Sequence, residues 1–370
     1  MAAQETTARD GGGQDGGGQD GGAQKRIALV GGGIIGRMHV AAMANVPELA
    51  LSALIDPMRS AADLAGQYGV PWYPDLETAL AAARPDGVLV ASPNETHLPL
   101  ARLCLKAGIP VLLEKPPANS IDEARELVAL QAETGVPVLV GHHRRYNPMI
   151  RTAKAAIDAG RIGELVLATV ICSLYKDEPY YTVAWRTRTG SGGPLHINLV
   201  HEIDLLRHFF GEIESVTAQV SNRRRGFQVE DTAAATVRFA AGGLGALTIS
   251  DAARGPWSWE NTSAETKRFP AHAAQAHFFS GSRAGLSLPD LRLWTHPPDG
   301  SWYDPQNSET LPFTPADPYA AQLRHFAAVI DGAEPMIGAL DGARTMATLE
   351  AIILAAETGQ ETRVPEIGAA

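Results

Sequence analysis

Residues Lys25–Arg37, which read KRIALVGGGIIGR, decide the fold of this chain. Arg26–Val30 is a short apolar run with β-branched residues, the pattern of a buried strand. The run leads directly into a Gly-x-Gly-x-x-Gly turn, and a helical pattern follows the turn. A strand, a glycine-rich turn and a helix in this order are typical of the first half of a dinucleotide-binding unit.

Each glycine of the turn has a physical reason. Gly31 permits the tight turn, Gly33 has no Cβ and lets a pyrophosphate approach the backbone, and Gly36 lets the helix pack close to the strand. The first helical residues, Ile34 and Ile35, offer free N–H groups and a partial positive charge to the phosphates. We therefore expect these five residues to bind the pyrophosphate of a cofactor.

The next strand supplies the acid that such a unit needs. Leu51–Ile55 ends at Asp56, about 20 residues past Gly36, where a carboxylate would meet the adenosine ribose hydroxyls. A carboxylate repels a 2′-phosphate, so Asp56 favours NAD, while the nearby Arg59 leaves NADP as an alternative. The agreement of strand, turn, helix, second strand and acid favours a cofactor site over a glycine turn that binds nothing.

Composition excludes several classes of protein. The net charge of −10 differs from the basic balance of nucleic-acid binders. No apolar run approaches the roughly 18 residues that span a bilayer, and the N-terminus lacks a secretory signal pattern. Two cysteines, Cys104 and Cys172, form neither a disulfide framework nor a four-ligand zinc site. We expect a cytoplasmic protein with no metal, no nucleic-acid partner and no membrane partner.

Composition and the order of the expected strands and helices divide the 370 residues into three parts. Residues 1–24 are rich in Gly, Gln and Asp and predict a disordered tail. Residues 25–145 alternate strands with helices, which predicts a doubly wound parallel sheet, the Rossmann arrangement. Residues 146–370 carry consecutive strands with few helices, which predicts a mostly antiparallel sheet. The fold class is therefore α/β, with a dinucleotide-binding domain followed by a substrate-binding domain.

The expected elements can be given by residue range. The first part should hold strands at 26–30, 51–55, 87–91, 111–113 and 136–140, and helices at 36–44, 60–68, 76–83, 97–106 and 121–134. The second part should hold strands at 165–173, 215–221, 231–239, 244–251, 276–281, 284–287 and 292–295. It should also hold helices at 195–210, 319–331 and 340–358, of which the last two pack back across the sheet or the first domain.

Polar clusters follow three of the expected parallel strands, on the edge where such sheets bind ligands. They are Ala91–His97, Glu114–Pro117 and Gly141–Pro148. Lys115 stands out, because a lysine there can hydrogen-bond a substrate oxygen, and partial burial can lower its pKa enough for proton transfer. From position alone, an ordinary surface lysine at a strand end is an equal alternative.

Several motifs taken together resemble the Gfo/Idh/MocA family of oxidoreductases. They are Gly31-x-Gly33-x-x-Gly36-x-x-His39, Ser92-Pro93-Asn94-x-x-His97, Glu114-Lys115-Pro116, Tyr146-Asn147-Pro148, Trp185-Arg186, Gly192-Gly193 and His201-x-x-Asp204-Leu205. The likeness covers nearly everything after the tail. It implies a Rossmann domain, then an α/β domain with a large, open, mostly antiparallel sheet. It also implies NAD(P)-dependent oxidation of a secondary alcohol, or reduction of a ketone, on sugars, inositols, polyols and related small molecules, usually by a homodimer or homotetramer.

The resemblance also implies site residues. Lys115 would be the catalytic group and His201 its partner. Besides the glycine turn and Asp56, the cofactor contacts would come from Ser92, Asn94, His97, Glu114, Lys115, Arg145 and Trp185. From the residues themselves, basic and aromatic side chains in later loops suit a polyhydroxylated ring. We therefore expect substrate contacts from Lys176, Arg144 and Trp257, although solvated surface roles are the alternative for each.

One departure from the family pattern concerns the residues before His201. The family commonly has Asp four residues earlier, and here that position is Ile197. Asn198, at three-residue spacing, would share a helix face with His201. We predict that Asn198 takes over the hydrogen-bonding role, and a residue that only buttresses the helix is the alternative. The missing Asp leaves two rival functions open: a non-catalytic dinucleotide-binding sensor and a redox-neutral enzyme that recycles tightly bound NAD.

Overall fold

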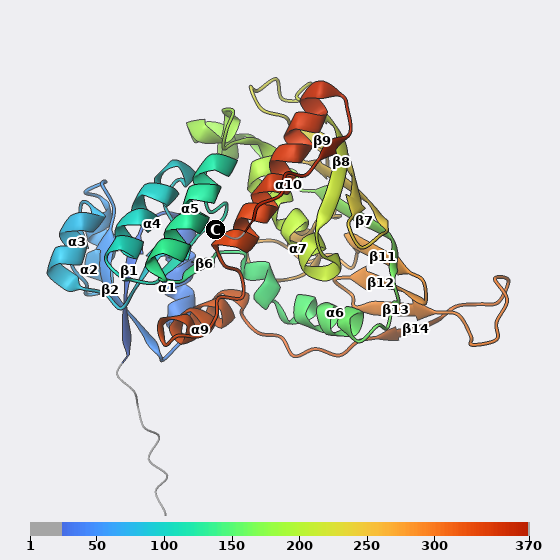
Figure 1. The fold of residues 1–370 in the computed structure, drawn as a ribbon, viewed down its shortest axis with the longest axis horizontal. Coiled ribbons are helices and arrows are strands. Elements are labelled where there is room, and N and C mark those ends of the chain that lie inside the picture. Colours follow the sequence, from blue (N-terminus) through green and yellow to red (C-terminus); the bar gives the residue numbers. More distant parts are fainter. Residues whose placement is uncertain (1–23, 369–370) are drawn as a thin grey trace, which may run out of the picture.

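The computed structural model describes residues 24–368, so residues 1–23 of the expected tail lie outside it. The described part contains two sheets flanked by helices, and the first sheet carries the predicted nucleotide unit (Figure 1). Among the described residues, no helix is both long enough and apolar enough to span a bilayer.

The first sheet has six parallel strands in the order β3-β2-β1-β4-β5-β6. The strands are β1 (Lys25–Val30), β2 (Leu49–Ile55), β3 (Trp72–Tyr73), β4 (Gly87–Val90), β5 (Val111–Leu113) and β6 (Val138–Val140). The chain leaves β1 on one side and returns at β4 on the other, so the strand order reverses between these two strands. Ligands of doubly wound sheets bind at such a reversal. The predicted parallel sheet is confirmed.

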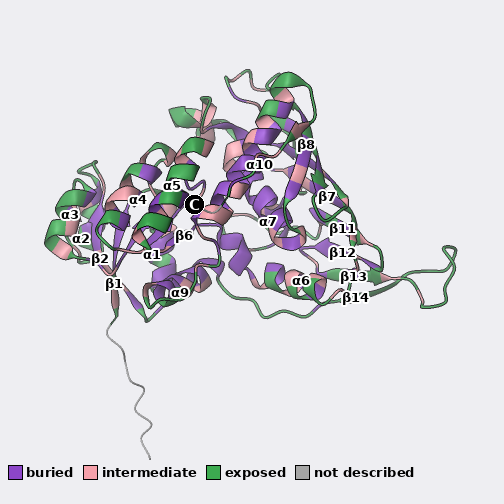
Figure 2. Cartoon of the chain, in the orientation of Figure 1, coloured by how far each residue is buried: buried purple, intermediate pink, exposed green. Residues whose placement is uncertain are grey.

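Helices cover both faces of this sheet. They are α1 (Ile34–Met43), α2 (Ala61–Gln67), α3 (Leu76–Ala83), α4 (His97–Lys106) and α5 (Ile121–Thr134). Successive residues of β1 serve opposite layers: Ile27 and Leu29 pack in a core with α1 and α2, and Ala28 and Val30 pack in a core with α3, α4 and α5. The strands are therefore buried on both faces, which is why they read as continuous apolar runs (Figure 2).

The second sheet has nine strands in the order β14-β13-β12-β11-β7-β10-β9-β8-β15. The strands are β7 (Leu165–Ser173), β8 (Ile213–Ser221), β9 (Thr232–Phe239), β10 (Leu244–Ser250), β11 (His277–Gly281), β12 (Ala284–Leu288), β13 (Arg292–Thr295), β14 (Asn307–Thr310) and β15 (Thr362–Arg363). Neighbouring strands are antiparallel except for β7 and β10, which run parallel. The mostly antiparallel second sheet is thus confirmed.

The remaining α-helices follow β6 in the chain, and they pack against the second sheet or return to the first. They are α6 (Pro148–Asp158), α7 (Val200–Phe210), α8 (Trp259–Thr262), α9 (Pro318–Ile330) and α10 (Ala339–Thr358). Leu323 and Phe326 of α9 are buried in the core of the first sheet, against α1. Helix α10 contacts α5 and β6 as well as α7 and β8, so it bridges the two sheets (Figure 1).

Candidate active site

The glycine turn between β1 and α1 fits a pyrophosphate. A Cβ on Gly33 would meet nothing within 4 Å, so a ligand has open access to the backbone there. A Cβ on Gly31 would lie 2.6 Å from the carbonyl oxygen of Ala91, and one on Gly36 would lie 2.0 Å from that of Gly31. No side chain caps the first turn of α1, so its N–H groups remain available to an anion.

Asp56 stands beside this turn at the end of β2. Its Oδ2 accepts a hydrogen bond from Gly32 N at 2.9 Å, and its Oδ1 accepts one from Met58 N at 2.9 Å. A carboxylate has further acceptor capacity beyond these two bonds, which leaves it able to accept from ribose hydroxyls. The guanidinium of Arg59 lies over the Trp72 ring, 5.9 Å from its centroid. The residues present therefore fit the adenosine half of NAD.

The loops after β4 and β5 are fixed to each other by His97. The ring of His97 is fully buried, with Nδ1 2.7 Å from the Pro116 carbonyl oxygen and Nε2 3.0 Å from that of Ser92. Burial lowers the pKa of this imidazole. Both ring nitrogens face backbone carbonyl oxygens, and the neutral ring can donate to only one of them at a time, which favours a role in positioning the cofactor loops over direct contact with a cofactor.

The other polar residues of these loops differ in whether their side chains are already held by a protein partner. Glu114 is buried, and its Oε1 lies 2.8 Å from Nε2 of His39, the histidine of the extended glycine motif. The Ser92 hydroxyl bonds the Thr96 hydroxyl at 2.6 Å, and the Asn94 side chain is partly exposed at the sheet edge. Ser92 and Asn94 thus remain open to a ligand, whereas Glu114 is committed to His39.

Lys115 projects from the end of β5 toward the second sheet's helices. Its Nζ donates a hydrogen bond to the carbonyl oxygen of Ile197 at 3.0 Å. Burial lowers the pKa of this amine to about 8, the Glu114 carboxylate opposes that effect, and the charges of Arg144 and Lys176 add to it. An amine with this pKa exchanges protons readily near neutral pH, as a general acid or base must.

His201 lies on the first turn of α7 and is buried. Burial, followed by the positive charge of Lys115, lowers its pKa well below the usual histidine range, so the ring is neutral at pH 7. Its centroid lies 5.4 Å from that of His143 and 6.2 Å from that of His142. Nδ1 of His201 is buried and has no hydrogen-bond partner among residues 24–368, whereas Nε2 is neither fully buried nor bonded within that part of the chain, so Nε2 is the ring nitrogen that a ligand can reach.

Asn198 lies in a π-helical turn, η5 (Leu195–Leu199), that precedes α7. The α-helical spacing that would align Asn198 with His201 does not hold through such a turn. The Asn198 Oδ1 accepts a hydrogen bond from Lys176 Nζ at 2.7 Å, and its Nδ2 donates to Glu260 Oε1 at 3.4 Å. The amide therefore orients Lys176, and neither of its two ends faces the site without a protein partner.

Two predicted arginines are held in buried ion pairs. Arg144 donates to Glu202 and to Glu260, both at 2.7 Å. Arg145 donates to both oxygens of Asp204, at 2.9 and 2.6 Å, and to Asp341 of α10 at 2.6 Å. These contacts neutralise both guanidinium groups, which favours structural roles over the substrate and cofactor contacts expected from the sequence.

The two predicted tryptophans lie on partly exposed loops. Trp185 belongs to a short 3-10 turn, η4 (Ala184–Thr187), and is 42% exposed. Trp257 is 47% exposed, and its carbonyl oxygen accepts a hydrogen bond from Ser173 N at 2.7 Å, which holds it beside the strand that leads to Lys176. Both rings are available to a ligand.

Some residues near the candidate site are not among the site residues predicted from the sequence. Glu265 accepts hydrogen bonds from His143, Asn147 and Trp259 at 3.1, 2.8 and 3.0 Å. The Tyr319 ring of α9 stacks on His143, with centroids 4.4 Å apart. His143 lies in the polar cluster Gly141–Pro148 that follows β6, but Glu265 and Tyr319 come from distant segments with no local signal.

Comparison with known proteins agrees with this geometry. Residues 25–142 match the profile of an oxidoreductase family with an NAD-binding Rossmann fold, and residues 150–269 match the GFO/IDH/MocA C-terminal domain. The chain belongs to the Gfo/Idh/MocA family. As a member, it is an NAD(P)-dependent oxidoreductase with an NAD-type cofactor site, and the predicted family, fold class and cofactor are confirmed.

Individual relatives of this family member are distant but cover most of it. A 1,5-anhydro-D-fructose reductase of Ensifer adhaerens is 30% identical over 75% of this chain and 80% of its own. An inositol 2-dehydrogenase of Rhizobium meliloti (strain 1021) is 25% identical over 89% of this chain and 96% of its own. The WlbA dehydrogenase of Bordetella pertussis, solved with NADH and UDP-GlcNAcA, is 23% identical and superposes with a TM-score of 0.75 over 93% of this chain and 99% of its own. This last likeness supports the fold alone.

Proposed function

We propose that this oxidoreductase transfers a hydride between NAD and a secondary alcohol or ketone of a sugar, inositol, polyol or related cyclic hydroxy compound. The names of the relatives, an inositol dehydrogenase and an anhydrofructose reductase, support this substrate class. Asp56 beside the glycine turn supports NAD over NADP as the preferred cofactor.

The observation that carries the proposal is the state of Lys115. Its amine titrates at about 8 and is tethered by one backbone carbonyl at the edge where parallel sheets bind ligands. Bound NAD would supply the carbon that accepts or returns the hydride. In the oxidation direction, the neutral Lys115 amine would take the hydroxyl proton of the substrate, and in the reduction direction its ammonium would return that proton.

The neighbouring groups would position the substrate oxygen. His201 is neutral, and its Nε2, which is neither fully buried nor bonded in the described structure, would accept or donate one hydrogen bond to the substrate. Asn198 would act indirectly, by holding Lys176 in place through the 2.7 Å bond. The structure therefore supports a modified role for Asn198, a positioning residue in place of the missing Asp.

The remaining site residues divide by position. We propose that Gly31, Gly33, Ile34, Ile35 and Gly36 bind the cofactor through the backbone. The side chains expected to join them are Asp56, Ser92, Asn94 and Trp185, with Glu114 and His97 behind them. The proposed division of labour gives residues 25–145 to the cofactor and 146–370 to substrate and subunit contacts, with α9 returning to the cofactor sheet.

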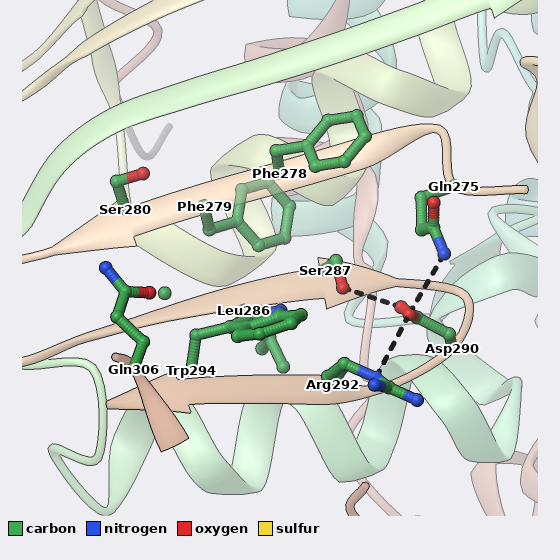
Figure 3. A pocket seen from close by; sticks show the side chains of 11 residues that line it. Gln275, Phe278, Phe279, Ser280, Leu286, Ser287, Asp290, Arg292, Trp294 and Gln306 are labelled. Carbon is green, nitrogen blue, oxygen red and sulfur yellow. Dashed lines mark hydrogen bonds and ion pairs between the residues drawn. The ribbon is translucent and has the colours of Figure 1, made fainter. Parts of the chain in front are cut away.

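We further propose that the protein is a cytoplasmic homodimer or homotetramer. The face of the second sheet away from its helices carries partly exposed Leu167, Leu244, Phe278 and Trp294. Phe278 and Trp294 border a hollow of about 720 Å³ on this face, at whose rim Asp290 bonds Ser287 at 2.7 Å (Figure 3). An apolar sheet face of this kind suits contact with a second copy. Two buried, unpaired cysteines suit a reducing compartment.

The proposal is tested by incubating the purified protein with NAD and a panel of polyols, inositols and sugars. A steady rise in the absorbance of reduced nicotinamide with one of them supports the dehydrogenase. Product formed by a cofactor that never leaves the protein indicates the recycling enzyme. Tight NAD binding without turnover of any member of a broad panel favours the sensor, for which the missing Asp is the motivating observation.

A further inference from the structure

The candidate active site holds three cations that have no carboxylate partner. They are Lys115, Lys176 and Arg186, and none of them has a carboxylate oxygen within 4.0 Å in residues 24–368. Their protein partners are neutral: Ile197 O for Lys115, the Asn198 amide for Lys176, and the Tyr180 carbonyl oxygen, at 2.7 Å, for Arg186.

The three cations form a connected row. Lys115 and Lys176 bond consecutive residues, Ile197 and Asn198. Lys176 and Arg186 share the Tyr180 ring, with Nζ of the lysine 4.7 Å and the guanidinium carbon of the arginine 4.0 Å from its centroid. A ligand that reaches Lys115 therefore lies within reach of a second and a third positive charge.

The nearby carboxylates are already paired with other groups. Glu114 bonds His39 at 2.8 Å, Glu260 bonds Arg144 at 2.7 Å, and the Asp251 carboxylate bonds Arg225 at 3.0 Å. The position where the family commonly places an Asp is Ile197. These three carboxylates are each paired with another side chain, and Glu260 and Asp251 act on the row only as nearby charges without a direct ion pair to it.

The backbone of Lys176 is fixed by two hydrogen bonds. Its backbone N–H donates to the Asp251 carbonyl oxygen at 2.9 Å, and its own carbonyl oxygen accepts from Arg225 at 2.6 Å. Its ammonium is partly buried and points at Asn198, so it is not a solvated surface lysine. Burial lowers the pKa of Lys176, as it does for Lys115, because the neighbouring carboxylates offset only part of the cost of burying each ammonium. Arg186 adds a buried Nε with no partner in the described structure.

We propose that the substrate is an acidic hydroxy compound, in which a carboxylate is bound by Lys176 and Arg186 while the reacting hydroxyl lies at Lys115. A carboxylate matches the fork of an arginine guanidinium and can accept from a lysine at the same time. This inference rests on the proposed function and narrows it from polyols in general to sugar acids and related hydroxy acids.

The test compares matched acidic and neutral sugars on the protein–NADH complex. Calorimetry measures the binding of D-glucuronate against D-glucose, and of D-galacturonate against D-galactose. Charge-assisted hydrogen bonds of this kind should make each acid bind about 10- to 100-fold more tightly than its neutral partner. Lys176→Met should bring that ratio close to one, Lys176→Arg should keep it well above one, and the matched control Lys154→Met, on the surface of α6, should leave it unchanged.

The outcomes distinguish failure of the proposed function from failure of the acidic-substrate proposal. NADH titration is measured first on each variant, and it also serves as the check that the variant is folded. Failure of the wild-type protein to bind NADH overturns the proposed function. Intact NADH binding with no preference for either acid, or with a preference that survives Lys176→Met, overturns the acidic substrate alone. A preference that Lys176→Met removes and Lys176→Arg retains supports it.

Discussion

Replacing Lys115 by methionine should remove activity and stabilise the protein at the same time. The amine titrates at about 8 against an ordinary value of 10.5, because burial disfavours its charged form. At about 1.4 kcal/mol for each tenfold change, holding the ammonium in this site costs at most about 3.5 kcal/mol. Loss of the bond to Ile197 O offsets about 1 kcal/mol of the gain, so we expect Lys115→Met to raise the free energy of unfolding by up to about 2.5 kcal/mol at pH 7.

The sign of this effect depends on pH. A lysine whose folded pKa is depressed destabilises the fold fully below about pH 8, where both states are protonated. The penalty fades as pH rises from about 8 toward 10.5, because the folded state has lost its proton while the unfolded state still holds one. The stability advantage of Lys115→Met over wild type should therefore shrink across that window, as measured by urea unfolding at several pH values.

The same substitution should lower the turnover of the best polyol or sugar-acid substrate by about 10²- to 10⁴-fold, the usual contribution of a general acid or base. In the wild type, the rate of oxidation should rise with pH and level off above about 8. NADH affinity should be retained. Lys154→Met is the matched control, since Lys154 pairs with Asp158 on the surface of α6. Unchanged turnover, or a variant that is less stable at pH 7, would refute the reasoning on Lys115.

Three further substitutions test the rest of the account. Gly36→Ala would place a Cβ 2.0 Å from Gly31 O and open the turn, so NADH affinity in a fluorescence titration should fall by about 10-fold or more, and an unchanged affinity would contradict the fit. Arg145→Met leaves Asp204 buried without its partner and should cost about 3 to 5 kcal/mol in urea unfolding with NADH affinity kept. Loss of NADH affinity without loss of stability would return Arg145 to the cofactor site. Asp56→Ala should reduce the preference for NADH over NADPH by about 10-fold, and a preference that stays the same would exclude Asp56 as its source.

The first sheet could be predicted because its signals are local. Helices α3, α4 and α5 have the expected bounds, since each combines apolar periodicity with a marked end such as Gly135, whose φ is +66°. Strand β3 has only two residues and shows no period that sequence reasoning could use. Helix α6 is not among the expected helices, although its start carries two local signals, the capping side chain of Asn147 and Pro148 at the first helical position.

The sequence indicated where Lys115 lies in the fold, but it did not indicate the hydrogen-bond partners of Asn198 and Arg144. Lys115 could be found because it directly follows a buried strand on the ligand-binding edge of a parallel sheet. The true surroundings of Asn198 could not, since they depend on a π-helical turn and on Lys176 and Glu260, which lie on other segments. Arg144 looked like a free cation in the sequence for the same reason: its partners Glu202 and Glu260 are brought to it only by the fold.

The central claim is that a hydride passes between a substrate carbinol carbon and the nicotinamide beside Lys115. It is tested most directly with a substrate that carries deuterium on the reacting carbon, followed by mass spectrometry of the cofactor recovered from the protein. The account predicts one deuterium on the reduced nicotinamide for each molecule of ketone formed, and almost no transfer by Lys115→Met. Ketone formed without label in the cofactor, or label transferred at the wild-type rate by Lys115→Met, would contradict it.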